Sequence, residues 1–530
     1  MKSPLQVIQT FRMHDATLPD AFDSRCEAKG QEPFVIQGGV ATSWDAFRDQ
    51  YLRLAHLFKS RGVGHGMRVA IMARNDMAHV LTLFALARLG AILVPVNPEF
   101  GAREAGYIMN HADVSGVIFD DTAMDVVLEV TGNMTGNVWT MTIEPNDRGM
   151  PAIKTDLWNH PALQAADPVK STDTCIIIYT SGTTGFPKGV MHSHANLITA
   201  GEANVARLHL QPDDRIMIIL PFFHVNAMFY SLGGTLASGA CMIIVPKFSA
   251  SSFWDTAADN GATVVNVIEA IGTILCNRDR REFRTDHKIR AAYGVRKAAA
   301  EIFRRDFGIN KLFSGFGMTE IPGVTCNPWN GPDKPGSMGV LGTHPDPERG
   351  WAQCRIVDDD GHDVKVGETG ELWVKTPIVM QGYFRDPEQT AQAFHDGWLK
   401  TGDLVRSDED GFYYHLSRKK DIIRRRGENI AAAEIEMVAA QQGSLSLVAA
   451  VAVASELGED EIMLVTVPKP GHTVSEQAIH DWCKQHLAAM KVPRYIVLTD
   501  DMPLTPTHKI LKAALRQDKT LLERAVDFQK

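Results

Sequence analysis

The segment IIIYTSGTTGFPKGVMHSH, residues 176–194, begins as a short apolar run and continues as a loop rich in glycine and hydroxyl residues. An apolar strand leading into such a loop is typical of polyphosphate binding, because close backbone N–H groups and a lysine neutralise the phosphate charge. The spacing differs from the loop of P-loop enzymes, since Phe186 and Pro187 separate the last glycine from Lys188. The segment therefore predicts a nucleotide site of another kind.

Helix and strand signals alternate on the N-terminal side of this loop. Thr42 or Ser43 can cap a helix whose apolar residues recur at helical spacing until Gly62. The strand-like stretches MRVAIM (67–72) and AILVPV (91–96) enclose a second helical segment. A strand, a helix and another strand in this order predict a parallel α/β unit.

The pattern changes after about residue 351, where short strands alternate with turn signals. A charge-rich segment, SRKKDIIRRRGEN (417–429), then precedes a compact α/β stretch. A chain of 530 residues exceeds one ordinary domain. We therefore expect an N-terminal domain at 1–419 and a C-terminal domain at 420–530, with the hinge near Lys420.

The composition narrows the class of protein. Hydrophobic residues make up 45% and charged residues 22%, as in a soluble globular protein. A net charge of −9 argues against a dedicated nucleic-acid binder. Seven widely spaced cysteines without a C-x-x-C pair predict reduced thiols rather than a disulfide framework or zinc site. Without an apolar signal segment or a run near the ~20 residues that span a bilayer, we expect a cytoplasmic protein with no membrane span.

Further motifs follow the loop in a fixed order. They are PFFH (221–224), GFGMTE (315–320), WLKTGDL (398–404), SRKKD (417–421) and PLTPTHKI (503–510). Together they resemble the adenylate-forming superfamily, which contains acyl-CoA synthetases, peptide-synthetase adenylation domains and firefly luciferase. The similarity covers nearly the whole chain. Within the superfamily, PFFHVNA and RRRGENIAAAEIE are similar to the crotonobetaine/carnitine–CoA ligase branch, and fatty-acid–CoA ligases are the other near branch.

The resemblance implies a fold and a reaction. The fold class is α/β: a large N-terminal domain of α/β subdomains plus a β-barrel-like part, and a small mobile α+β C-terminal domain. The reaction uses ATP and Mg²⁺ to activate a carboxylic acid as acyl-AMP, releases pyrophosphate and transfers the acyl group to coenzyme A. A stand-alone adenylation enzyme that loads a carrier protein, or an inactive adenylate-binding regulatory protein, is the alternative.

The loop chemistry and the resemblance together assign nucleotide roles. Lys509 is the expected adenylation catalyst, Thr319 the α-phosphate contact and Glu320 the Mg²⁺ ligand, with Thr184 as a second metal ligand. Asp403 can accept from both ribose hydroxyls, although Thr-Gly-Asp is also good turn chemistry. The expected ATP/AMP-binding residues are Thr180, Ser181, Gly182, Thr183, Thr184, Gly185, Lys188, Gly294, Gly315, Phe316, Gly317, Met318, Thr319, Asp403, Arg418 and Lys509.

The expected acyl pocket is mostly apolar, which suits a fatty, aromatic or polycyclic acid. It comprises His224, Val225, Asn226, Met228, Phe229, Ile268, Ile271, Tyr293, Gly315 and Phe316. His224 either acts in catalysis, by orienting the carboxylate or gating the pocket, or is a partly buried histidine that forms its hydrogen bonds with backbone groups. Glu269 could instead pair with a quaternary ammonium beside aromatic rings. His508 stands where the family usually has glycine, and Tyr293-Gly294 departs from the usual adenine-side loop.

In this superfamily the C-terminal domain rotates between the two half-reactions, here about Lys420. The rotated state would bring the basic run to the site for coenzyme A, with Arg424, Arg426, Gly427 and Glu428 as the expected contacts and Arg425 as a further phosphate partner. An exposed basic strand is the alternative. Oligomeric state is not readable from the sequence, and a homodimer stays open.

Overall fold

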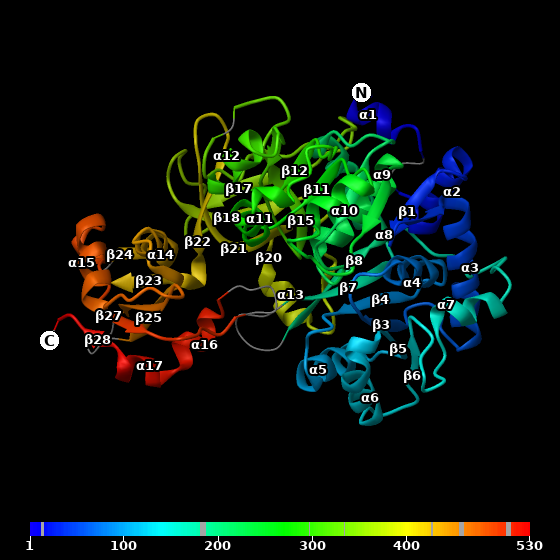
Figure 1. The fold of residues 1–530 in the computed structure, drawn as a ribbon, viewed down its shortest axis with the longest axis horizontal. Coiled ribbons are helices and arrows are strands. Elements are labelled where there is room, and N and C mark those ends of the chain that lie inside the picture. Colours follow the sequence, from blue (N-terminus) through cyan, green and yellow to red (C-terminus); the bar gives the residue numbers. More distant parts are fainter. Residues whose placement is uncertain are drawn as a thin grey trace. The chain divides into compact units, whose positions relative to one another are not determined.

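The computed structural model describes residues 1–11, 15–180, 187–295, 297–332, 334–425, 428–454, 460–504 and 510–529, with backbone only at 297–298 and 428–429. The chain forms two compact units (Figure 1). The first comprises Met1–Thr180, Pro187–Cys354 and Val374–Leu399, and the second comprises Arg355–Trp373 and Lys400–Lys530. The hinge expected near Lys420 lies inside the second unit and stays a prediction.

Two seven-stranded sheets build most of the first unit. One has the order β13 (Lys311–Phe313), β12 (Ala291–Tyr293), β11 (Val264–Asn266), β9 (Arg215–Ile218), β10 (Cys241–Ile244), β1 (Pro33–Gln37) and β2 (Val40–Ser43). The other has the order β19 (Gly382–Tyr383), β8 (Lys188–Ser193), β7 (Thr174–Thr180), β4 (Ile92–Val96), β3 (Arg68–Met72), β5 (Gly116–Phe119) and β6 (Trp139–Thr142).

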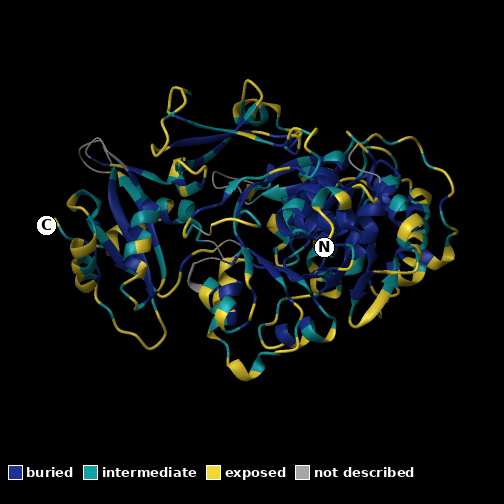
Figure 2. Cartoon of the chain, turned by 90° about the horizontal axis from the view of Figure 1, so that it is seen from above, coloured by how far each residue is buried: buried dark blue, intermediate teal, exposed yellow. Residues whose placement is uncertain are grey.

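Both sheets are covered on both faces, as the alternation of their side chains shows. In β3, Val69 and Ile71 belong to a core shared with helices α3 (Trp44–Ser60), α4 (Met77–Arg88), α8 (His194–Leu208) and α9 (Gly233–Ser238). Ala70 and Met72 face a second core with α5 (Ala102–Ala112) and α6 (Met124–Gly132). Successive strand residues point to opposite faces, so the shared core is a helical layer between the sheets. Figure 2 shows the buried residues gathered in these strands and helices.

In the sheet that contains β9 and β10, alternate side chains also face two different cores. Ile216 and Ile218 face the shared core, whereas Met217 and Ile219 face a third core. That core is completed by α10 (Phe253–Asp259), α11 (Glu269–Asn277) and α12 (Lys297–Arg305). The first unit is therefore a five-layer α/β arrangement, which confirms the α/β class expected from the sequence.

The local predictions around the first helices are confirmed. The Ser43 side chain caps α3 by accepting a hydrogen bond from the Ala46 N–H, as a good N-cap residue does. Strand β3 forms within the predicted stretch 67–72, and β4, which pairs with β3 in parallel, forms within the predicted stretch 91–96. The helix expected between them is α4, capped by Asp76.

Besides the two-stranded sheet of β23 (Ile422–Arg425) and β24 (Glu428–Ala431), the described residues of the second unit form two further sheets. One includes β17 (Gln353–Val357), β18 (Gly370–Lys375), β21 (Trp398–Ser407) and β22 (Tyr413–Arg418). The other joins β25 (Leu445–Ala454), β26 (Asp460–Pro468), β27 (Tyr495–Leu498) and β28 (Val526–Asp527), and packs against α14 (Ala432–Ala440) and α15 (Glu476–His486). Over the described ranges, no helix is both long and apolar enough to cross a membrane.

Candidate functional site

The GFGMTE motif forms a tight hairpin. Strand β14 (Gly315–Met318) pairs with β15 (Ile321–Cys326), and the Met318–Ile321 pair leaves Thr319 and Glu320 as the turn. A Cβ atom on Gly317 would lie 2.4 Å from the Tyr230 hydroxyl oxygen, and one on Gly315 would lie 2.8 Å from the Tyr293 hydroxyl oxygen. Backbone atoms are as close, with the Thr325 carbonyl oxygen 2.3 Å from a Cβ on Gly315 and the Gly323 nitrogen 2.5 Å from one on Gly317, so the packing of the hairpin requires both glycines.

The carboxylate of Glu320 is held beside strand β8. Glu320 is 7% exposed, and its Oε1 atom accepts a hydrogen bond from the Tyr383 hydroxyl at 2.8 Å. The Lys188 ammonium lies 4.8 Å from the centre of the same tyrosine ring. The structure thus brings together two residues expected for nucleotide binding, Lys188 and Glu320, although 132 positions separate them (320 − 188).

The backbone of the hairpin turn is fixed from the same side. His192, on β8, is fully buried, and its Nε2 atom lies 2.7 Å from the Thr319 carbonyl oxygen. Burial lowers the pKa of His192 to about 4, so the ring is neutral near pH 7 and Nε2–H donates to that carbonyl. The Met380 N–H donates to the Glu320 carbonyl at 2.8 Å. Both turn residues are therefore anchored by hydrogen bonds from distant parts of the chain.

The strands that flank the glycine-rich loop are also in place. Thr180, the last residue of β7, pairs with Lys188, the first residue of β8, in an antiparallel ladder. The turn that joins them, with the expected phosphate contacts Ser181, Gly182, Thr183, Thr184 and Gly185, lies outside the described residues. The predicted strand is confirmed as β7, whereas Lys188 and Gly189, expected in the loop, already belong to β8. The phosphate contacts stay predictions.

The PFFH motif leads into an unusual helix. Residues Asn226–Leu232 form a π-helix, η3, a rare element found often at functional sites. Asn266, at the end of β11, donates from Nδ2 to Asn226 Oδ1 and to Ser231 Oγ, both at 3.1 Å. These two acceptors lie five residues apart, the hydrogen-bond spacing of a π-helix, so Asn266 fixes one of its faces. Asn266 was not anticipated, because a lone asparagine at a strand end carries no sequence signal.

The expected acyl-pocket residues differ widely in how far they are buried. His224, Val225 and Asn226 are half-buried at the start of η3. Phe229 is completely buried, with its ring 4.7 Å from that of His192. Of the remaining candidates, Ile271, Tyr293, Phe316 and Met228 are buried, Gly315 is half-buried and Ile268 is exposed. Glu269, the suggested partner of a quaternary ammonium, is also exposed.

Gly294 is required where it stands. Its φ of +89° lies in the left-handed region, and a Cβ atom there would lie 1.9 Å from the Val267 carbonyl oxygen. Gly294 follows β12, beside the pair formed by Tyr293 and Tyr230, whose ring centres are 5.6 Å apart. At this end of the sheet, the contact with Val267 requires glycine at position 294, and Tyr293 packs against Tyr230. These contacts involve the two residues at which the sequence departs from the usual adenine-side loop.

A second group of expected nucleotide contacts lies in the second unit. Asp403 on β21 is 1% exposed and pairs in register with Arg418 on β22. Its Oδ1 atom is 2.9 Å from Arg418 Nε and 2.9 Å from His415 Nε2. In the part of the chain that the structure describes, Asp403 Oδ2 is buried without a hydrogen-bond partner. A buried acceptor of this kind fits a bound hydroxyl group.

The basic run near the expected hinge has two different faces. Lys420 is exposed in the 3-10 helix η5 (Lys419–Asp421), and Arg424 is exposed on β23 (Ile422–Arg425). Arg425 is buried, pairs with Glu461 at 2.8 Å and donates to the Met490 and Val492 carbonyls. The prediction that Arg425 binds a phosphate of coenzyme A is therefore wrong. Successive side chains of a strand point to opposite faces, and that of Arg425 points inward.

Some expected residues cannot be placed. Arg426, Gly427 and Lys509 lie outside the described residues, as does His508. Glu428 begins β24 (Glu428–Ala431), where only its backbone is described. Their expected roles at coenzyme A and in adenylation stay predictions.

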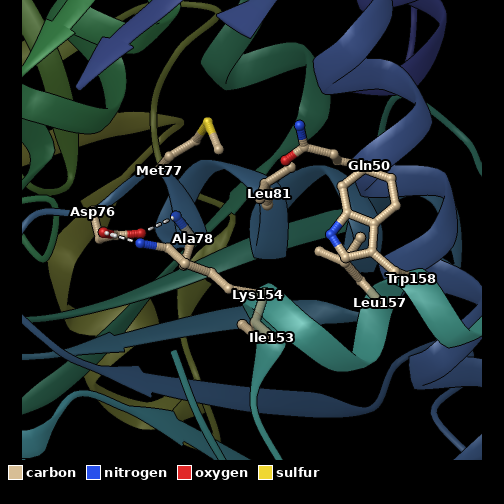
Figure 3. A pocket seen from close by; sticks show the side chains of 9 residues that line it. All are labelled: Gln50, Asp76, Met77, Ala78, Leu81, Ile153, Lys154, Leu157 and Trp158. Carbon is tan, nitrogen blue, oxygen red and sulfur yellow. Dashed lines mark hydrogen bonds and ion pairs between the residues drawn. The ribbon is translucent and has the colours of Figure 1, made fainter. Parts of the chain in front are cut away.

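The pocket in Figure 3 is lined by none of the residues expected for the site. It has a volume of about 190 Å³ and lies between α3, α4 and α7 (Ile153–Asp156). The Lys154 ammonium is 3.6 Å from Asp76, whose carboxylate also accepts the Ala78 N–H. The residues that line it are Gln50, Asp76, Met77, Ala78, Leu81, Ile153, Lys154, Leu157 and Trp158, none of which the sequence predicted for the site.

The layered fold is that of an α/β enzyme, and two residues that the motifs assign to a nucleotide, Lys188 and Glu320, contact the same tyrosine. The chain belongs to the AMP-binding enzyme family, whose model matches residues 22–384, and the model of the AMP-binding enzyme C-terminal domain matches residues 434–509. The expected resemblance to adenylate-forming enzymes is confirmed. ATP, Mg²⁺ and coenzyme A are the cofactors of this class, as expected.

Relatives and solved structures agree with this family. The chain is 28% identical over 526 residues to a crotonobetaine/carnitine–CoA ligase of Shigella flexneri, covering 94% of this chain and 98% of that protein. It resembles ATP-bound MatB from Rhodopseudomonas palustris with a TM-score of 0.83 and 25% identity, over 94% of this chain and 98% of the other. The anthranilate CoA ligase AuaEII with anthranoyl-AMP, at 22% identity, TM-score 0.85 and 99% and 100% coverage, shows the shared fold.

Proposed function

We propose that the protein is an AMP-forming acid–thiol ligase that joins a carboxylic acid to coenzyme A. In the first step a carboxylate oxygen attacks the α-phosphorus of ATP, the bond to the β-phosphate breaks, and pyrophosphate leaves. In the second step the sulfur of coenzyme A attacks the acyl carbon and displaces AMP, while the thiol proton passes to solvent. The observation that carries the proposal is the contact of both Lys188, which follows the glycine-rich segment in sequence, and Glu320 with the side chain of Tyr383.

The residues present fit a magnesium ion. Glu320 offers a hard oxygen ligand at a rigid turn, and one carboxylate together with substrate phosphates is a normal Mg²⁺ site. When bound, the ion would neutralise phosphate charge. Thr319 lies in the same turn, where it would contact the α-phosphate, and the Lys188 ammonium supplies a further positive charge. His224, at the start of η3, would face the acid.

The test of the proposed function is pyrophosphate release with MgATP across a panel of fatty, aromatic, polycyclic and betaine-like acids, with and without coenzyme A. Release that needs one acid and increases with coenzyme A is the expected result and identifies the acid. Release that stalls near one equivalent regardless of coenzyme A would indicate a carrier-protein loading enzyme. No release across the panel would contradict the proposed function and favour the inactive binder.

Asp403→Ala is expected to remove discrimination between ATP and 2′-deoxyATP. The unpartnered Oδ2 of Asp403 is the proposed acceptor for ribose hydroxyls, and a hydrogen bond to a charged group is worth about 10- to 100-fold in affinity. We expect the wild type to prefer ATP by that factor and the variant to use both nucleotides equally and weakly. A variant that keeps the wild-type ratio of kcat/KM values would contradict the ribose role.

Glu269→Gln tests the hypothesis that the acid carries a quaternary ammonium group that pairs with Glu269. Glu269 begins α11 and is exposed, and exposed ion pairs contribute little, so the preference for a cationic over a neutral acid should fall by about two- to fivefold. The measurement is the ratio of kcat/KM values for a quaternary ammonium acid and a neutral acid of equal length. An unchanged ratio would contradict the pairing of Glu269 with the ammonium group.

A further inference from the structure

Tyr383 connects two residues that the sequence assigned to separate motifs. Its hydroxyl donates to Glu320 Oε1 at 2.8 Å, and its ring lies 4.8 Å from the Lys188 ammonium. Tyr383 itself is 9% exposed. A single buried side chain therefore contacts the proposed magnesium ligand through its polar end and the proposed phosphate lysine through its ring.

The backbone around Tyr383 holds the ring in a fixed place. Tyr383 is opposite Val190 in the antiparallel pair of β19 and β8. Its N–H donates to Thr390 Oγ1 at 2.9 Å, and the neighbouring Phe384 N–H donates to the Gly189 carbonyl at 2.7 Å. Hydrogen bonds thus anchor the backbone of Tyr383 from two directions, so the strand holds the base of the side chain in place while the hydroxyl contact with Glu320 fixes the far end of the ring.

This geometry has a chemical consequence for each partner. A hydrogen bond to one carboxylate oxygen fixes the orientation of Glu320 and leaves its second oxygen for a hard cation, the usual effect of a partner behind a metal ligand. The face of the ring attracts the Lys188 ammonium without neutralising it, as a carboxylate would. The lysine thus keeps its full charge for a phosphate.

We propose that Tyr383 is the positioning residue of the proposed nucleotide site, orienting Glu320 for the metal and Lys188 for the phosphates. The inference rests on the proposed function, and it adds a residue that lies in none of the recognised motifs. Two contacts made by one side chain also predict two separable defects, one in metal binding and one in ATP binding.

Tyr383→Phe removes the hydroxyl and keeps the ring. We expect Mn²⁺, used as the probe for Mg²⁺ and followed by electron paramagnetic resonance with ATP and no acid, to bind about 10- to 100-fold more weakly. Affinity for metal-free ATP should stay at the wild-type value, because the ring still faces Lys188. Tyr383→Leu removes both contacts and should weaken metal-free ATP as well as the metal.

Tyr51→Phe is the matched control. Tyr51 on α3 is also buried, and its hydroxyl lies 3.4 Å from Asp23 Oδ1, so the substitution removes the same type of contact elsewhere. Metal affinity equal to the wild type in Tyr383→Phe, or an equal loss in both phenylalanine variants, would overturn the proposal. Wild-type protein that neither releases pyrophosphate nor binds Mn²⁺ with ATP would instead contradict the proposed function, so the two failures are distinguishable.

Discussion

Lys509→Ala is expected to slow acyl-adenylate formation by about 100- to 1,000-fold, the usual loss when one preorganised donor to a developing charge is removed. The lysine, assigned from the PLTPTHKI motif, would bridge the carboxylate and the α-phosphate as the reaction proceeds. Thioester formation from added acyl-adenylate should stay near the wild-type rate, because the rotation of the C-terminal domain that the resemblance implies would remove the lysine from the site before this second step.

The measurement compares pyrophosphate release with acyl transfer from synthetic acyl-adenylate in the same preparation. Lys512→Ala is the matched control, since Lys512 belongs to the same basic stretch and pairs with Glu436 at 2.6 Å. It should leave both rates nearly unchanged. An equal loss of both rates in Lys509→Ala would contradict the division of the two steps.

Glu320→Gln is expected to lower kcat by about 100- to 1,000-fold and to raise the Mg²⁺ concentration needed for half-maximal activity. The substitution removes the charge that a hard cation prefers, while the amide oxygen can still accept the Tyr383 hydroxyl. The loss therefore reports on the charge itself rather than on the contact with Tyr383.

A magnesium titration of initial rates, together with thermal unfolding, checks this expectation. The buried turn should keep its stability, because the hydrogen bond from Tyr383 and the Met380 contact to the Glu320 carbonyl are retained. A variant that unfolds at the wild-type temperature and titrates with magnesium as the wild type does would rule out Glu320 as a metal ligand.

Local patterns predicted much of the fold. The cap at Ser43 and the helical spacing of apolar residues gave the correct start of α3, and the strands β3 and β4 followed from short apolar runs. These features depend on neighbours in sequence, where periodicity and capping act directly. The hairpin that carries Thr319 and Glu320 also lies within one motif.

The residues that hold the site in place were not predictable in this way. Tyr383 is 63 positions from Glu320, and His192 is 127 positions from Thr319. Their contacts depend on which strands become neighbours in the sheet, and no local pattern specifies that. Arg425 was predicted wrongly for a different reason. A run of three arginines suggested one exposed basic face, but alternate side chains of a strand point to opposite faces, and Arg425 points inward to Glu461.

The most direct test of the central claim is the fate of oxygen atoms during one turnover. With the acid labelled by ¹⁸O in both carboxylate oxygens, attack on the α-phosphorus must leave one labelled oxygen in AMP, and mass spectrometry of the released nucleotide measures it. The account predicts singly labelled AMP and unlabelled pyrophosphate in the presence of coenzyme A. AMP without label, or label in a phosphate or pyrophosphate product, would contradict activation through an acyl-adenylate.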